Sequence, residues 1–318
     1  MSNSKKLLLW NSFPSLCLVI VLILLNSFFT NNFISTSFAS SFFTSYTPLI
    51  IVAIAQSIVI IGKGIDLSVG GIISLVNVVI VSVVGMGFSL PIAFIVGILT
   101  GIIMGALNGI VIGYFRVTPL LATLATSSIA GGIALWIMPY PGGQVGMDYI
   151  LWYQDMIFGI LPNPIIFIII SILIWLVWKF TPVGLSLYAM GRDINKTYAS
   201  GVAVNKIQFL TYVSSGLLSS IAAIALTANT GAGDPLIGST YTLYAVAATV
   251  VGGISLYGGI GDAFGAIFGA IFLGLAFTLV FSLHFPSFYQ DLASGVIVLL
   301  GIIGAAIMKL RSNKVITS

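Results

Sequence analysis

The chain has 318 residues, of which 59% are hydrophobic and 6% are charged, and it contains no glutamate. This composition excludes an ordinary soluble domain and predicts an all-α integral membrane protein, because an apolar helix of about 20 residues spans a bilayer. The formal net charge of +4 does not indicate nucleic-acid binding, since the basic residues form no patch interleaved with aromatic side chains.

Ten apolar segments are long enough to be membrane helices. The first, 7–29, follows Lys5 and Lys6. Because Ser37-Phe38-Ala39 lies far beyond the apolar centre for a cleavage site, we favour an uncleaved helix, with a signal peptide as the alternative. The other expected spans are 47–61, 66–84, 91–113, 119–138, 163–180, 207–228, 242–257, 263–283 and 288–308.

The basic residues indicate the orientation of these spans. With a cytoplasmic amino terminus and strict alternation, every basic residue falls at a cytoplasmic end, as the positive-inside rule requires. These residues are Lys5, Lys6, Lys63, Arg116, Lys179, Arg192, Lys196, Lys206, Lys309, Arg311 and Lys314. We therefore expect a multi-pass protein of the bacterial cytoplasmic (inner) membrane, with both termini in the cytoplasm.

An internal repeat is suggested by a Gly-x-Asp-x-x-x-Gly pattern at Gly64, Asp66 and Gly70, which recurs one residue tighter at Gly233, Asp234 and Gly238. The halves, about 7–138 and 163–308, would each hold five spans. An odd number inverts one half relative to the other, so we expect a single domain made of two inverted five-helix repeats. The alternative is that glycine is simply common in membrane helices.

Both halves also carry glycines at helical spacing. Every fourth residue lies on one helix face, and a missing side chain lets two backbones approach closely. We expect this packing role for Gly97, Gly101, Gly105 and Gly109, which continue to Gly113, and for Gly261, Gly265 and Gly269 in the second half.

Polar residues within or beside the spans are candidates for a translocation path or gate. Asp66 is either the cap of a helix that starts at Leu67 or part of a path. Amides and hydroxyls suit an uncharged hydroxyl-rich solute, although hydrogen bonds between helices explain them equally well. The candidates are Asp66, Ser68, Asn77, Asn108, Thr123 and Thr126.

The sequence contains no energy source of its own. No charged residue or histidine falls in the middle of an expected span, and no phosphate-binding Gly-x-x-x-x-Gly-Lys-Ser/Thr motif is present. One cysteine and one histidine exclude a multi-ligand metal site of those residues, and the scattered aspartates form no catalytic set. We therefore expect no enzyme activity and no cofactor on this chain. Either it is a passive channel, or a partner drives it from the basic interval 179–206.

Three segments in order carry a family resemblance: GIDLSVG at 64–70, TPLLATL at 118–124, and the glycine-rich stretch 241–265. They resemble the membrane subunits of bacterial ATP-binding-cassette importers for ribose and related monosaccharides. The resemblance runs from about Pro48 to Ala306. One departure is that Thr242 and Tyr244 stand where the family usually has acids.

The resemblance implies an importer permease for a monosaccharide or a related hydroxylated solute. It implies a separate ATPase that binds ATP and Mg, a second permease copy or paralogue, and an extracytoplasmic solute-binding protein. Within a coupling loop at 181–206, a short cytoplasmic helix would dock on the ATPase, and an ordinary anchor loop is the alternative. The docking residues would be Gly191, Arg192, Asp193, Lys196, Ser200 and Gly201. The rival function is a passive or ion-coupled carrier that works without an ATPase.

Overall fold

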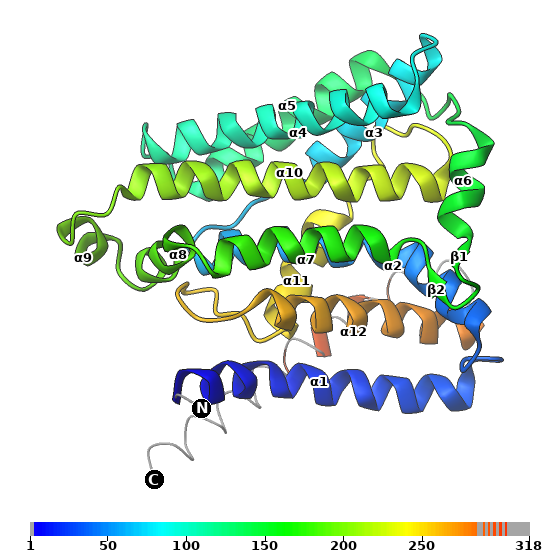
Figure 1. Ribbon diagram of the computed structural model, residues 1–318, viewed down its shortest axis with the longest axis horizontal. Coiled ribbons are helices and arrows are strands. Elements are labelled where there is room, and N and C mark those ends of the chain that lie inside the picture. Colours follow the sequence, from blue (N-terminus) through cyan, green and yellow to red (C-terminus); the bar gives the residue numbers. More distant parts are fainter. Residues whose placement is uncertain are drawn as a thin grey trace.

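The computed structural model describes residues 3–284 and single positions between 289 and 303, with side chains from Phe13 onward (Figure 1). The regular secondary structure of this part of the chain is helical apart from a small hairpin of β1 and β2, which pair antiparallel. The elements are α1 (Asn3–Phe29), α2 (Thr36–Ile61), α3 (Val69–Gly85), α4 (Leu90–Gly113), α5 (Pro119–Ile137), α6 (Met147–Gln154), β1 (Met156–Ile157), β2 (Leu161–Pro162), α7 (Ile165–Lys179), α8 (Pro182–Arg192), α9 (Ile194–Ala199), α10 (Val204–Thr230), α11 (Tyr241–Val251) and α12 (Ala263–Ser282).

Five of these helices, α2, α4, α5, α10 and α12, are long and apolar enough to cross a membrane. The pair α7 and α8, bent by 76° at the break between them, is a sixth candidate. The helices α3 and α11 are apolar but shorter. The expectation of an all-α membrane protein is confirmed for the described residues.

Local sequence explains where several helices begin and end. Pro91 and Pro119 lie in the first turns of α4 and α5, where the missing N–H of proline leaves no hydrogen bond unmade. Asp262 caps α12 by accepting a hydrogen bond from the Phe264 N–H at 3.1 Å. The helix α10 ends at Gly231, whose φ of 71° is left-handed, a conformation that glycine adopts without strain.

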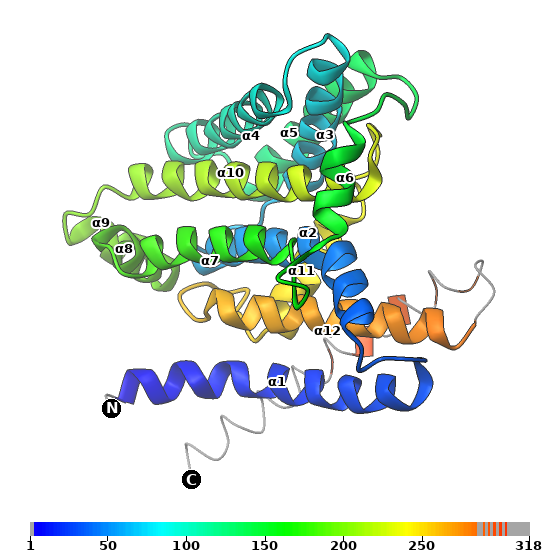
Figure 2. The same ribbon diagram turned by 45° about the vertical axis from the view of Figure 1, so that its right-hand side comes forward.

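The helix α2 lies in the centre of the molecule (Figures 1 and 2). Its isoleucines Ile50, Ile51, Ile54 and Ile58 are fully buried, as expected for a helix that is apolar all round and has protein on every side. The helix α10 packs beside α2, α3 and α4. By contrast, α4 and α5 expose large apolar side chains, which marks their outer faces as the surface that meets lipid.

Four expectations differ from the structure. The helix α2 begins at Thr36, not at 47, because Ser35 caps it by accepting a hydrogen bond from the Phe38 N–H. Pro48 lies inside this helix and does not mark its start. The helix α3 begins at Val69, so Asp66 lies in coil. The helix α11 ends at Val251, not at 257, because Gly253 has a φ of 83°. The interval expected as a loop between 139 and 164 contains α6 and the hairpin. Only scattered positions of the expected span 288–308 belong to the described residues, so this span is not described as an element.

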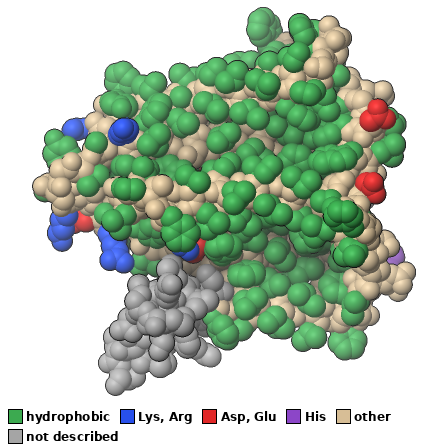
Figure 3. Space-filling model, viewed as in Figure 1, with side chains coloured by type: hydrophobic (Ala, Val, Ile, Leu, Met, Phe, Trp, Pro, Cys, Tyr) green, Lys and Arg blue, Asp and Glu red, His purple; other side chains and the backbone are tan. Residues whose placement is uncertain are grey.

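Charged side chains divide between the two ends of the molecule. Figure 3 shows lysine and arginine gathered at the end where α8 and α9 lie, whereas acidic side chains appear at both ends and histidine lies at the opposite end. The helix α1 begins at the basic end (Figure 1). The described basic residues therefore share one side of the expected membrane.

Candidate functional site

A coil of residues 62–68, the first coil, joins α2 to α3 and is built from the GIDLSVG segment. Its backbone is held by side chains from other helices. The Leu67 N–H donates to the Thr123 hydroxyl of α5 at 3.0 Å. With its amide oriented to satisfy both atoms, the buried Gln56 of α2 bonds the backbone N–H and carbonyl of Asp66 at 3.2 and 3.1 Å. Thr123 and Gln56 thus replace the hydrogen bonds that a helix would have made.

Asp66, only 1% exposed, lies at the centre of a polar cluster. Its Oδ1 accepts hydrogen bonds from the Ser68 N–H at 2.8 Å and from the Ser68 hydroxyl at 2.6 Å. Its Oδ2 accepts from the Ser215 hydroxyl of α10 at 2.7 Å, and Asn108 of α4 donates to the Ser68 hydroxyl at 2.8 Å. All of these partners are neutral side chains or backbone groups. Lys63, three residues before Asp66 in the sequence, is exposed and makes none of these hydrogen bonds.

The expectation that Asp66 caps a helix starting at Leu67 is therefore wrong in detail. The helix begins two residues later, and Asp66 closes a turn with Ser68 instead. The carboxylate still accepts from the N–H of Ser68, the residue just before α3, and so lies at the end of the helix where the positive end of the dipole favours negative charge.

A coil of residues 231–240, the second coil, joins α10 to α11 and has the same kind of support. Asn77 of α3 accepts from the Asp234 N–H at 2.7 Å and donates to the Ala232 carbonyl at 3.2 Å. The Ser74 hydroxyl accepts from the Gly238 N–H at 2.9 Å. Asp234 Oδ1 accepts from the N–H two residues ahead at 2.8 Å, the same turn that Asp66 makes.

The two coils meet where their helices begin. The Gly70 N–H donates to the Thr242 hydroxyl of α11 at 3.2 Å. A Cβ on Gly238 would lie 2.9 Å from the carbonyl carbon of Gly70, and a Cβ on Gly70 would lie 3.2 Å from that of Gly238. The last glycine of each repeat motif therefore lies against the other, and neither position has room for a side chain.

The structure brings together four of the candidate path residues, Asp66, Ser68, Asn108 and Thr123, around the first coil. Asn77, in α3, bonds the backbone of the second coil instead. These five side chains are buried, and their hydrogen bonds go to protein atoms. Thr126 is apart from both clusters, half-buried on α5, where its hydroxyl donates to the Ala122 carbonyl at 3.0 Å.

The candidate docking residues lie at the basic end. The short helix expected over 191–202 is divided, because Gly191 and Arg192 end α8 while α9 covers Ile194–Ala199. Asp193 separates the two helices and accepts from the Lys196 N–H at 3.0 Å, a bond that lowers the pKa of its carboxyl group. Arg192, Lys196 and Ser200 are exposed. Gly201 ends the segment with a φ of 82°.

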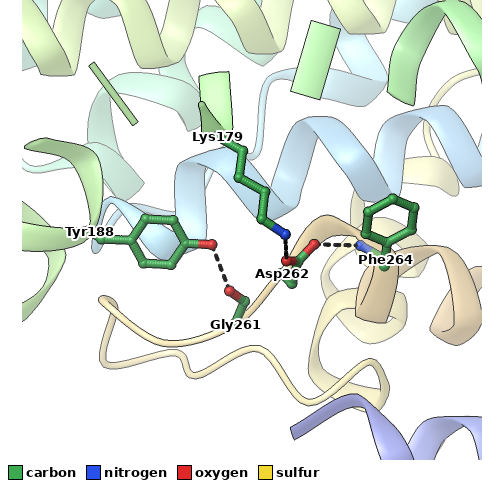
Figure 4. A network of polar contacts seen from close by, with 5 residues as sticks. All are labelled: Lys179, Tyr188, Gly261, Asp262 and Phe264. Carbon is green, nitrogen blue, oxygen red and sulfur yellow. Dashed lines mark hydrogen bonds and ion pairs between the residues drawn. The ribbon is translucent and has the colours of Figure 1, made fainter. Parts of the chain in front are cut away.

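Sequence reasoning missed one charged pair at this end. Figure 4 shows Lys179, the last residue of α7, in an ion pair with Asp262, and the Tyr188 hydroxyl donating to the Gly261 carbonyl at 2.7 Å. The pattern of positive charge placed Lys179 correctly at this end. A single aspartate just before an apolar segment gave no signal beyond helix capping, because its partner is 83 residues away in the chain.

The glycines of α4 lie against α10. A Cβ on Gly101 would lie 2.6 Å from the Gly216 carbonyl oxygen, and one on Gly109 would lie 2.8 Å from that of Phe209. Gly97 instead faces Ile80 of α3. In the second half, Gly269 packs against α11, but Gly261 lies in coil with a φ of 136° and does not belong to the helix. The two glycine series thus contact different neighbours.

Comparison with known proteins identifies one family, described as "Branched-chain amino acid transport system / permease component", which matches residues 38–306. The chain is 32% identical to the ribose import permease protein of Escherichia coli, over 91% of this chain and 92% of that protein. It is 30% identical to the ribose import permease protein of Haemophilus influenzae, over 90% of each chain. It is 28% identical to the fructose import permease protein of Bifidobacterium longum, over 95% and 93%. No solved structure matches significantly.

Proposed function

The chain belongs to the family of permease components of branched-chain amino acid transport systems, and on this premise we propose that it imports a monosaccharide. It is the membrane subunit of an ATP-driven importer and forms the translocation path, and it is not an enzyme. The resemblance drawn from the three motifs is confirmed by this membership.

One observation carries the choice of solute. Similarity at 28 to 32% identity extends over nine-tenths or more of the chain, and the proteins concerned are named for ribose and fructose. The family description names amino acids, which are zwitterions and need charged partners in a binding path. Among the described residues, the polar candidates around the two coils are hydroxyls and amides apart from Asp66, whose carboxylate is already held by Ser68 and Ser215, so they offer a zwitterion no free charged partner.

ATP and Mg would be bound by a separate ATPase, because this sequence has no phosphate-binding loop. The exposed basic end supports a docking surface made of Arg192, Asp193, Lys196, Ser200 and Gly201, with the buried Gly191 behind it at the end of α8. There α8 and α9 would enter a cleft of the ATPase, with Arg192 and Lys196 as the charged contacts. The positive-inside rule then makes the basic end cytoplasmic, and both termini with it.

The arrangement of the coils supports two inverted repeats of five spans. The first coil enters from the basic end and the second from the opposite end, and the helices that follow them start side by side (Figure 1). Both coils have the same aspartate turn and the same glycine four residues later. Short helices that begin at mid-membrane from opposite sides are typical of transporters with inverted repeats.

We assign the candidate path residues to the gate between these repeats. Five of them, listed last, would hold the two coils in one arrangement, since their hydrogen bonds link the coils to the surrounding helices α3, α4, α5 and α10. These are Asp66, Ser68, Asn108, Thr123 and Asn77. Thr126 would face the path itself from the accessible side of α5. The path would be completed by a second permease copy or paralogue, with a solute-binding protein delivering the sugar from outside.

Reconstitution tests the function. Vesicles would hold the permease with its ATPase, and a cognate solute-binding protein would be added outside. They should accumulate ribose or fructose only when ATP is supplied inside. Vesicles that lack the ATPase should accumulate none. Accumulation of leucine but no sugar would overturn the solute class, and sugar accumulation without the ATPase would establish the rival carrier.

A further inference from the structure

The loop between α11 and α12, residues 252–262, is folded onto itself at the basic end. The Ser255 N–H donates to the Ile260 carbonyl at 3.0 Å, and the Gly258 N–H donates to the Ser255 carbonyl at 2.9 Å. Gly258 and Gly259 have φ values of 82° and 68°, so the turn needs glycine at both positions. The loop is a compact unit that ends at Asp262, the cap of α12.

This loop is attached to both α2 and α8. The Gly259 N–H donates to the Ile61 carbonyl at the end of α2, at 2.8 Å. The Tyr188 hydroxyl of α8 donates to the Gly261 carbonyl at 2.7 Å. Gly191, which ends α8, fits into the same junction, because a Cβ there would lie 2.5 Å from the Gly259 nitrogen. The end of α8 thus rests directly on the loop.

A partly buried ion pair fixes the beginning of α8 to the same loop (Figure 4). Lys179 lies just before the bend between α7 and α8, and its ammonium group contacts Asp262 Oδ2. The side chains are only 23% and 7% exposed, and the Lys179 nitrogen also lies 5.7 Å from the centre of the Phe264 ring. Charged hydrogen bonds shielded from water are stronger than neutral ones, and removing one partner leaves the other charge unpaired.

These contacts connect α8 to the rest of the protein by a second route. Along the chain, α8 and α9 lead into α10. Through the loop, α8 also holds the start of α12 and the end of α2, far from it in sequence. We propose that the 252–262 loop, clamped by Lys179–Asp262 and Tyr188–Gly261, transmits the movement of the docking segment to α12. Lys179, Asp262 and Tyr188 are then positioning residues for coupling. This inference rests on the proposed ATPase partner.

Two variants isolate the clamp in the complete complex. Asp262→Asn removes the charge but keeps an oxygen that can cap α12. Lys179→Met removes the charge but keeps an unbranched apolar stem. Arg116→Asn is the matched control, because Arg116 is an exposed basic residue at the same end and asparagine tolerates its φ of 58°. Each variant is reconstituted with the ATPase and binding protein and tested with ribose and fructose.

We expect Asp262→Asn and Lys179→Met each to lower the sugar taken up per ATP hydrolysed by about fivefold or more, the range of ordinary coupling energies. The double variant should be no worse than either single variant, and Arg116→Asn should match wild type. Complex assembly and the rate of ATP hydrolysis should persist. Unchanged uptake per ATP, losses that multiply in the double variant, or loss of assembly in parallel with uptake would overturn the inference.

Hydrogen exchange gives a readout that needs no solute. In the wild-type permease and ATPase complex, binding of a non-hydrolysable ATP analogue should change amide exchange in both 191–202 and 252–262. In Asp262→Asn the response at 191–202 should remain and that at 252–262 should disappear. A response that persists in both segments would overturn the clamp. Wild-type vesicles that take up sugar without the ATPase would instead contradict the proposed function.

Discussion

The contact between α4 and α10 makes Gly101→Ala a direct test of the glycine packing. The added methyl would clash with the Ser220 hydroxyl, which must rotate away from the Gly216 carbonyl that it bonds. The methyl would also lie 2.6 Å from the Gly216 carbonyl oxygen, whereas ordinary contacts begin at 3.4 Å, so the helices must in addition separate by about 0.8 Å. Overpacking of this kind costs about 1–3 kcal/mol, and the better helix propensity of alanine returns up to about 1 kcal/mol. With the full return, we expect a net destabilisation of up to about 2 kcal/mol, measured by unfolding of the purified permease in detergent.

Gly132→Ala is the matched control, because it is also a glycine inside a membrane helix but nothing lies within 4 Å of its Cβ position. It gains the same helix propensity without a clash, so its stability should equal or exceed that of wild type by up to about 1 kcal/mol. The reasoning fails if Gly101→Ala is as stable as Gly132→Ala, since the close approach of α4 and α10 would then carry no energetic consequence.

Three further changes test the coils and the docking surface. Gly70→Ala should lower the thermal midpoint in detergent because it forces the two coils apart, whereas Gly85→Ala, with nothing near its Cβ, should not; equal midpoints would contradict the contact. Asp66→Val should cost about 3 kcal/mol or more, because three donors lose their acceptor. Asp66→Asn should cost much less, and equal losses would show that the hydrogen bonds do not matter. Arg192→Glu combined with Lys196→Glu should lower ATP-driven uptake by about tenfold or more without reducing the amount inserted in the membrane, and normal uptake would count against docking there.

The helices that begin at a strong local sequence signal were predicted well. The expected bounds of the spans at α4, α5 and α12 lie within one residue of the observed ones, because Pro91, Pro119 and Asp262 mark helix starts whatever the surroundings. The prediction failed at α2, where Ser35 is the true cap. Its first turns mix serine with phenylalanine and resemble a loop until Phe42 and Tyr46 are seen packed together.

The composition of the polar cluster could be predicted, but its partners could not. The GIDLSVG segment singled out Asp66, yet Ser215 is 149 residues away and is one of many serines in apolar segments. The same holds for Lys179 and Asp262. Contacts between distant segments depend on how helices pack in three dimensions, and a single sequence carries no periodicity that pairs one hydroxyl with one carboxylate.

The two ends of the proposed coupling route differ in the strength of their contacts. At the meeting of the coils, the links between segments are made by serine, threonine, asparagine and glycine. Such hydrogen bonds contribute about 0.5–1.5 kcal/mol each, or about 1.5–3 kcal/mol where one partner is charged, as at Asp66. A hydroxyl can also rotate to a new partner.

At the basic end, by contrast, a charged pair and a close-fitting glycine junction hold α8 to the loop. A transporter needs this distribution, because a force applied at the docking surface moves a gate only if the contacts near the force are stiffer than those at the gate. The order of stiffness, not the identity of any single polar residue, is therefore what the proposed mechanism requires of this fold.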